Sequence, residues 1–190
     1  MAKNNSYKLP LKKLLLAQFG AAILGLMMNL PTSTLANSKL LDLITSIIAI
    51  LFFLYIQFTA MWDIGAKDKI AIDGGRMAED QLYGFKAAFM ANIPNYILAF
   101  ICVFAKALFV LTDIVWAETA SFMTYLVSLL WNGMYIGVLE CLVPPQNNGL
   151  LSIAYMCLFF VITLPSLFTC FFAYRLGLKG TRIFPEKKKS

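Results

Sequence analysis

Long runs of apolar residues, separated by short polar stretches, extend over most of the chain. Most of these runs are about as long as the roughly 20 residues with which an α-helix crosses the hydrocarbon core of a bilayer. At about 1.5 Å per residue, even the shortest gives a helix of about 26 Å, which is just enough to cross. We therefore predict five hydrophobic helical segments, at residues 14–30, 40–62, 87–112, 120–143 and 150–174.

The composition favours the same interpretation. Hydrophobic residues make up 60% of the 190 residues and charged residues only 14%, with a mean hydropathy of +0.74. A soluble domain is nearer to half apolar and a quarter charged. So much apolar surface cannot be hidden inside one small globule, and the lipid bilayer must cover the rest. We expect an all-α integral membrane protein with a single transmembrane domain over residues 1–190.

The positions of the charges predict how the chain is oriented. Of the 16 lysines and arginines, all but Lys39 and Lys106 lie near the two ends of the chain or in the polar loop 63–86. Basic residues beside membrane spans are found preferentially on the cytoplasmic side. We therefore expect both termini and loop 63–86 on the cytoplasmic side of the cell membrane, which requires an even number of crossings.

Segment 120–143 is the one that we expect not to cross. Asn132-Gly133 interrupts it and leaves two arms of about a dozen residues, each too short to span a bilayer. Four transmembrane helices plus this re-entrant segment then satisfy the positive-inside rule. If segment 14–30 instead lay on the membrane surface, loop 63–86 would face outward, and a fifth true crossing would place the basic C-terminal tail outside. Whether segment 120–143 spans or re-enters stays open.

Segment 14–30 has a second interpretation. A basic start, an apolar stretch and Thr34-Leu35-Ala36 as a possible cleavage site are also features of a secretory signal peptide. Its apolar stretch is long for a signal peptide and contains Gln18, which favours a membrane span. The topology of the remaining segments is the same in both cases.

The residue types present argue against catalysis. The chain contains no histidine, which is the commonest general base and metal ligand. Its four cysteines lie in apolar segments, and none of them forms a CxxC pair: Cys102, Cys141, Cys157 and Cys170. We therefore expect no enzyme activity, no cofactor and no metal. Because the basic residues flank apolar runs, we also expect no nucleic-acid binding.

Polar side chains inside the apolar segments are the candidates for a ligand site. With the predicted topology, several of them lie about 7–12 Å from the cytoplasmic end of their span: Gln18, Gln57, Asn92, Asn95 and Thr169. Carboxamides in lipid need partners, so these side chains should face the protein interior. They form either a hydrogen-bonded network that joins the helices or a polar vestibule that binds a ligand, with Asn132 of the broken segment as a further candidate.

Two ionisable residues are predicted near the outer face. Lys106 lies close to the end of segment 87–112, and Glu140 lies close to the end of segment 120–143. If segment 120–143 re-enters, both lie at a similar depth and form an intramembrane ion pair, which is a functional hypothesis by default. The alternative is that each side chain reaches separately to the outer interface.

A stripe of small residues follows one face of segment 14–30. Ala17, Ala21 and Gly25 are spaced by four, which lets another helix approach closely. The approaching helix belongs either to the same chain or to a membrane protein partner. The stripe, together with the chain length, resembles the substrate-binding subunits of energy-coupling-factor transporters. That resemblance implies docking of this helix onto a shared transmembrane subunit.

A second resemblance rests on the polar loop and the last apolar segment. The motifs that carry it are Gly65-x-Lys67-Asp68, Gly75-Arg76, Asp80, Gly84 and Ala173-Tyr174-Arg175-Leu176-Gly177. These motifs are similar to those of an uncharacterised family of small bacterial polytopic membrane proteins. The family has no established activity, so the resemblance implies a membrane location and adds no mechanism.

Two functional hypotheses follow. The first is a small transport-related subunit or permease-like component that uses the polar side chains and the broken segment. The second is a non-catalytic scaffold or regulatory protein that acts through partner proteins. A transport subunit needs an enclosed polar cavity, whereas in a scaffold the polar residues are satisfied by one another. The sequence does not identify a substrate, an energy source or an oligomeric state, although four helices enclose little volume and a partner or homo-oligomer is expected.

Overall fold

A computed structural model describes residues 8–35, 39–112, 115–142 and 153–180. These residues form helices connected by turns, and none of them lies in a strand. The order of the elements is α1 (Lys8–Leu35), α2 (Lys39–Asp73), α3 (Tyr83–Thr112), α4 (Val115–Trp131), the short 3-10 helix η1 (Gly133–Tyr135), α5 (Ile136–Leu142), α6 (Ile153–Val161) and α7 (Leu164–Leu178). The predicted all-α class is confirmed.

The described residues contain four helical segments that are long and apolar enough to cross a membrane: Pro10–Asn29, Lys39–Asp73, Tyr83–Thr112 and Tyr155–Leu178. A further apolar segment, made of α4 followed by η1 and α5, is bent by 85° at its break. The break falls at Asn132–Gly133, where the sequence predicts it, because α4 ends at Trp131 and η1 begins at Gly133. The fold is therefore that of a multi-pass integral membrane protein with four spans and one broken segment.

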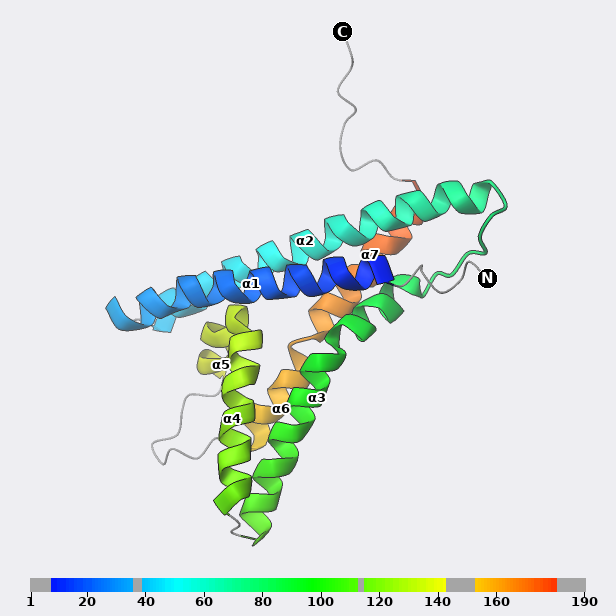
Figure 1. The fold of residues 1–190 in the computed structure, drawn as a ribbon. Coiled ribbons are helices and arrows are strands. Elements are labelled where there is room, and N and C mark those ends of the chain that lie inside the picture. The colour runs from blue at the N-terminus through cyan, green and yellow to red at the C-terminus, as the bar shows by residue number, and fades with distance from the viewer. Residues whose placement is uncertain (1–7, 36–38, 113–114, 143–152, 181–190) are drawn as a thin grey trace.

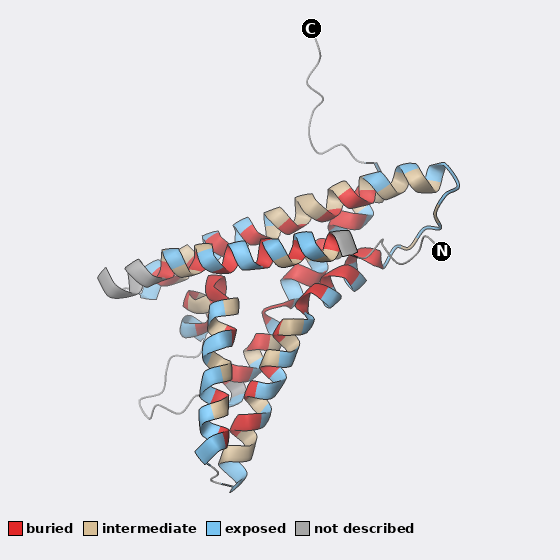
Figure 2. Ribbon diagram, in the orientation of Figure 1, coloured by how far each residue is buried: buried red, intermediate tan, exposed pale blue. Residues whose placement is uncertain are grey.

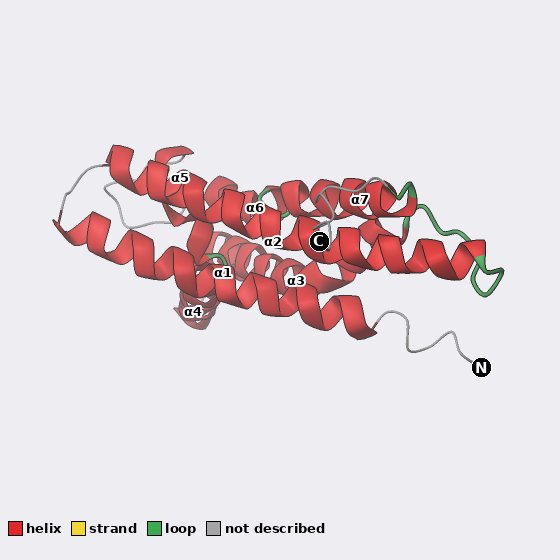
Figure 3. Ribbon diagram, turned by 90° about the horizontal axis from the view of Figure 1, so that it is seen from above, coloured by secondary structure: helices red, strands yellow, loops and turns green. Residues whose placement is uncertain are grey.

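The helices form two groups, which meet at one end of the molecule and again where the break after α4 lies against α1 and α2 (Figure 1). α1 and α2 lie side by side and antiparallel, with α7 along the second half of α2 (Figures 1 and 3). α3, α4 and α6 form the second group, which is steeply inclined to the first. The start of α1, the end of α2, the start of α3 and the end of α7 all gather at the end where the groups meet. The far ends of the two groups splay apart.

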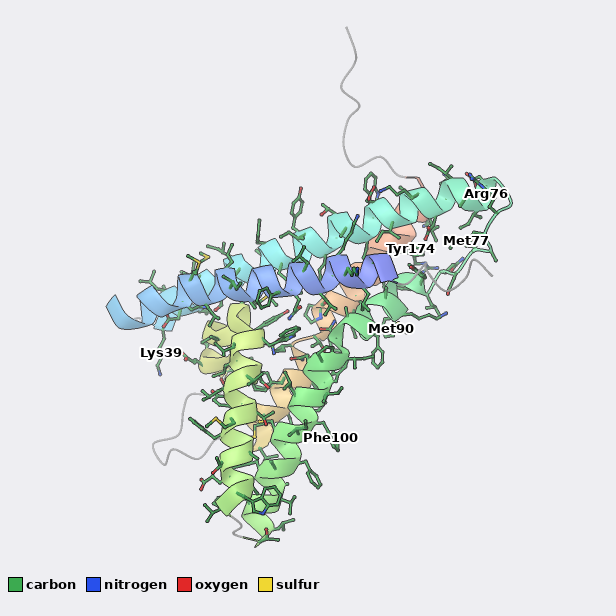
Figure 4. The ribbon with its side chains drawn as sticks, viewed as in Figure 1. Lys39, Arg76, Met77, Met90, Phe100 and Tyr174 are labelled. Carbon is green, nitrogen blue, oxygen red and sulfur yellow. The ribbon has the colours of Figure 1, made fainter. Side chains whose placement is uncertain are left out.

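Tyr174 of α7 marks the place where the two groups join (Figure 4). Its ring is fully buried, and its centroid lies 5.1 Å from that of Tyr83 at the start of α3. Its hydroxyl donates a hydrogen bond of 3.0 Å to Oδ2 of Asp68 on α2. Gly65 of α2 allows the backbone of α7 to approach closely at the same place, because a Cβ there would collide with the carbonyl oxygen of Tyr174.

Large apolar side chains cover the outward faces of the helices. Figure 2 shows the buried residues concentrated between the helices and exposed residues along their outer sides. Leu51 of α2, Phe100 of α3 and Phe122 of α4 are each exposed, and Phe100 projects away from the protein in Figure 4. An apolar surface of this extent is typical of a protein that lipid surrounds.

The helices differ from the predicted segments at two places. Loop 63–86 is helical as far as Asp73. An ion pair of 2.7 Å between Asp63 and Lys67, four residues apart, adds support to this part of the helix. α2 then ends in a turn at Gly75, whose φ of 67° only glycine adopts readily. The predicted Asp73-Gly74-Gly75 turn is thus confirmed, although the loop that follows α2 is shorter than expected.

The other difference concerns the predicted span 150–174, which contains Pro165, a residue expected to kink a helix. The structure divides it into α6 and α7, with a turn at Ile162 and Thr163. Pro165 lies in the first turn of α7, where its missing N–H leaves no helical hydrogen bond unmade. Both parts still belong to one candidate span, Tyr155–Leu178.

Glycines bring the broken segment into backbone contact with α1 and α2. A Cβ on Gly25 of α1 would collide with the backbone of Met134 in η1, and a Cβ on Gly133 would lie 2.6 Å from the carbonyl oxygen of Ala22. On the other side, a Cβ on Gly137 would collide with the carbonyl oxygen of Asp42 in α2. The break is therefore held between the first two helices, with no room for side chains at the contact points.

This contact predicts a stability difference between two glycine substitutions. Gly137→Ala forces the Asp42 carbonyl and Gly137 apart, so we expect it to lower the free energy of unfolding by about 2–4 kcal/mol. Gly20→Ala is the matched control, because a Cβ at exposed Gly20 of α1 meets nothing within 4 Å. It should leave stability unchanged or raise it by up to about 1 kcal/mol through helix propensity. Thermal unfolding in detergent measures both, and equal losses would contradict the docked arrangement.

Candidate functional site at the break between α4 and α5

The break frees main-chain polar groups that an unbroken helix would satisfy, and side chains of α1 and α2 bind two of them. Nδ2 of Asn29 donates to the carbonyl oxygen of Gly133 at 3.1 Å. The N–H of Gly137 donates to Oγ of Ser46 at 2.9 Å. In a membrane interior an unsatisfied backbone group costs several kcal/mol. These two contacts therefore stabilise a bend that lipid alone would not support.

Asn29 joins three elements at this point. Besides contacting η1, its Oδ1 accepts hydrogen bonds from Oγ1 of Thr45 at 2.8 Å and from Oγ of Ser46 at 3.3 Å, both on α2. Neither Asn29 nor Ser46 is among the site residues predicted from the sequence. The sequence shows that each is a polar residue in an apolar segment. Their contacts with Gly133 and Gly137 depend on how the helices pack, which the sequence does not show.

Asn95 and Asn132, two of the predicted site residues, come together on the other side of the break. Nδ2 of Asn132 donates to Oδ1 of Asn95 at 2.6 Å and to the carbonyl oxygen of Ser128 at 2.9 Å. Nδ2 of Asn95 in turn donates to the carbonyl oxygen of Phe159 at 3.0 Å. The pair of carboxamides therefore links the end of α4 to α3 and α6.

Three buried oxygens at this break have no hydrogen-bond partner within the described residues: Oγ of Ser128, Oδ1 of Asn132 and the hydroxyl of Tyr135. Ser128 and Asn132 are fully buried and Tyr135 is 4% exposed. Ser128 and Asn132 are four residues apart, so they share one face of the helix. A buried polar group without a partner costs about 1–3 kcal/mol, and three within eight positions form the largest concentration of unmet hydrogen-bonding capacity in the described structure.

The chemistry of these oxygens defines what they can bind. The carboxamide oxygen of Asn132 only accepts hydrogen bonds, whereas the hydroxyls of Ser128 and Tyr135 accept and donate. Apolar rings pack around Tyr135, including Phe53 and Phe159. Each of these oxygens can therefore accept a hydrogen bond from water or from a donor group on a small polar solute.

The remaining carboxamides of the predicted polar layer bond elsewhere. Asn92 donates to the carbonyl oxygen of Ala88 at 2.9 Å and to Oγ of Ser166 on α7 at 3.5 Å. Oε1 of Gln57 on α2 accepts from Sγ of Cys170 on α7 at 3.8 Å. These contacts join α2 and α3 to α7, which is what the structural alternative predicts for them. Buried Gln18 and half-buried Thr169 complete the predicted set.

Lys106 and Glu140 do not form the predicted ion pair in the structure. Lys106 is buried on α3, and its Nζ lies 4.9 Å from the ring centroid of Phe109. Glu140 is exposed on α5, which packs along α2. The physical reason is the 85° bend, which directs α5 away from α3. The ion pairs of the described residues are Lys13–Asp63, Lys67–Asp63 and Lys86–Asp80.

The small-residue stripe of α1 packs largely inside the chain. Ala21 is 2% exposed, and Gly25 contacts the backbone of Met134. Ala17 is also buried and lies near the outer edge of the same face. Of the two predicted alternatives, these contacts are those of packing within the monomer.

The short loop before α3 is held by its own charges. Nζ of Lys86 lies 2.8 Å from Oδ2 of Asp80, and the N–H of Leu82 donates to Oδ1 of Asp80 at 3.1 Å. The hydrogen bond from Lys86 lowers the pKa of the Asp80 carboxyl below its usual value of 3.8. Nη2 of Arg175 on α7 donates to Oε1 of Gln81 at 2.8 Å. Nowhere in the described ranges do three His, Cys, Asp or Glu side chains lie close enough together to hold a metal ion.

The separation of Lys106 from Glu140 predicts that the effects of replacing them are independent. We expect Lys106→Met and Glu140→Gln to change the free energy of unfolding by amounts that add in the double variant within about 0.5 kcal/mol. Equilibrium unfolding of the four proteins in mixed micelles measures the interaction. If the double variant is more than about 1 kcal/mol more stable than the sum of the single effects predicts, the two side chains do interact in the wild-type protein.

The comparisons with known proteins leave the family of the chain undetermined. No family model matches the sequence, and neither a curated protein nor a solved structure is significantly similar to it. The resemblances to energy-coupling-factor subunits and to a family of small bacterial membrane proteins therefore stay predictions.

Proposed function

We propose that the protein is a small transport-related membrane component in which the break between α4 and α5 contacts a small polar solute. The observation that carries this proposal is the set of three buried oxygens without partners, on Ser128, Asn132 and Tyr135. Broken helices with polar groups at membrane depth are a recurring feature of transporter binding sites. Such irregular backbone is tolerated in a bilayer only where protein or a water-filled cavity covers it.

The solute is expected to be uncharged and rich in hydrogen-bond donors. Asn132 provides an acceptor, and the hydroxyls of Ser128 and Tyr135 provide further acceptors. The nearest ionisable candidate on α3, Lys106, lies eleven residues beyond Asn95, which is about 16 Å along a helix. An anion entering this site would therefore find no basic group of α3 beside it and would pay a large desolvation cost. Amide- or hydroxyl-bearing solutes fit these conditions best.

The orientation that we propose places the meeting point of the two helix groups in the cytoplasm. Four basic residues belong to the helix ends that gather there and contact one another's neighbours: Lys13 and Lys67 pair with Asp63, Lys86 pairs with Asp80, and Arg175 bonds to Gln81. The positive-inside rule supports a cytoplasmic location for them, and with it cytoplasmic N- and C-termini in the cell membrane. The break at η1 then lies between this end and the opposite, outer face.

A second candidate function is that of a non-catalytic scaffold or regulatory protein that acts through partners. The observation in its favour is that most buried carboxamides are satisfied by neighbouring helices, as the contacts of Asn29, Asn92 and Asn95 illustrate. Polar contacts of this kind join membrane helices and contribute about 1 kcal/mol each. In this case the three oxygens at the break would be covered by permanently bound water.

The two candidates differ in whether the break opens to solutes. We suggest testing this with Ser128→Cys in a background in which the exposed Cys141 and Cys157 are replaced by serine. The probe is iodoacetamide, an uncharged thiol reagent that carries an amide like the proposed solutes, applied to native membrane vesicles. Because a transport site must open to water, we expect the new thiol to be modified at least about tenfold faster than a thiol in the packed interior of the protein.

Ser121→Cys is the matched control for this experiment. Ser121 lies on the same helix and is 2% exposed, but its Oγ donates to the carbonyl oxygen of Cys102 at 3.3 Å. Faster labelling at position 128 than at position 121 supports the transport-related function. Equally slow labelling at both positions would reject it and favour the scaffold.

A further inference from the structure

We propose that the groove between α1 and α2 binds one anionic phospholipid, with an acyl chain along the groove and the headgroup beside Lys13. The groove, here called the α1–α2 groove, has a volume of about 540 Å³ and is lined only by residues of α1 and α2. Leu16 and Gly20 of α1 line it together with Phe52 and Ile56 of α2. It is separate from the break between α4 and α5, so this inference goes beyond the proposed transport role.

The apolar part of the groove contains unfilled space beside Gly20. Gly20 carries no side chain, and a Cβ built there would meet no atom within 4 Å. Leu16 and Phe52 stand on either side and are 73% and 46% exposed, respectively. In a bilayer, hydrocarbon must fill such a gap, because water would leave its hydrogen bonds unmet there.

The other end of the groove is polar and carries an excess of positive charge. Lys13 and Asp63 line this end, with Nζ of Lys13 at 3.7 Å from Oδ2 of Asp63. The same carboxylate oxygen lies only 2.7 Å from Nζ of Lys67. Lys12 is exposed next to Lys13. Two ammonium groups therefore share one carboxylate, and Lys13 keeps hydrogen-bond donors for an anionic headgroup.

The length of the groove matches a single leaflet. On α2 it extends from Phe52 to Asp63, eleven residues or about 16 Å of helix. Half of a hydrocarbon core of about 30 Å is about 15 Å. A transmembrane helix of a partner, or a second copy of this chain, would be expected to make contact across both leaflets. A groove that is apolar for one leaflet and basic at its end fits a phospholipid better.

The test is lipid retention from vesicles of equal parts phosphatidylglycerol and phosphatidylcholine. The reconstituted full-length protein is extracted gently, and the bound lipids are identified by mass spectrometry of the intact complex. We expect the wild-type protein to retain one phosphatidylglycerol in preference to phosphatidylcholine. Gly20→Leu places a side chain in the gap, where a Cβ meets no atom within 4 Å, and should weaken this retention about tenfold. Lys13→Gln should remove the preference between the two headgroups.

Met27→Leu is the matched control, because Met27 is an exposed residue of α1 that does not line the groove. It should retain phosphatidylglycerol as the wild-type protein does. Equal retention of the two lipids by the wild-type protein would overturn the proposal, as would undiminished retention by Gly20→Leu. A dimer that Gly20→Leu dissociates would overturn it as well, by identifying a second copy of the chain as the occupant.

Discussion

The structure depends on how a broken helix satisfies its main-chain hydrogen bonds in an apolar medium. A helix that ends inside a membrane leaves N–H and C=O groups without partners, and water is not available to replace them. Here Asn29 and Ser46 bind the carbonyl of Gly133 and the N–H of Gly137. These contacts require α1 and α2 to lie within van der Waals distance of the break, and glycines at the contact points make that approach possible. The arrangement of the first two helices and of the bend is therefore one structural unit.

The packing of α1 and α2 against the bend also explains where the buried oxygens without hydrogen-bond partners lie. Asn29 and Ser46 satisfy the side of the break that faces α1 and α2, and Asn95 satisfies one end of the Asn132 side chain. The oxygens that stay without a hydrogen-bond partner belong to Ser128, Asn132 and Tyr135, in the broken segment itself. Three unmet groups at about 1–3 kcal/mol each would be a large part of the stability of a small protein. A solute or bound water at this place removes that cost, and this is the physical basis of the proposed function.

The sequence predicted those features that depend on local chemistry. The length of the apolar runs predicted the four spans, and a polar residue beside a glycine predicted the break at Asn132–Gly133. It did not predict the direction of the 85° bend, which depends on packing between distant helices, and the Lys106–Glu140 pair was wrong for that reason. Asn95 and Asn132 were both predicted as candidate site residues, but their hydrogen bond to each other was not predicted. Ser128 and Tyr135 were missed, because in an apolar run they look like ordinary helix residues until their missing partners are seen.

The most direct test of this account is an experimental structure of the protein in a lipid nanodisc, at a resolution that shows ordered water. The account predicts a bend at Gly133 with η1 against α1 and α2. It also predicts density for water or a solute at about 2.7–3.2 Å from the oxygens of Ser128, Asn132 and Tyr135. A straight, continuous helix through residues 115–142 would contradict it, as would a dry interior in which those three oxygens bond only to other protein groups.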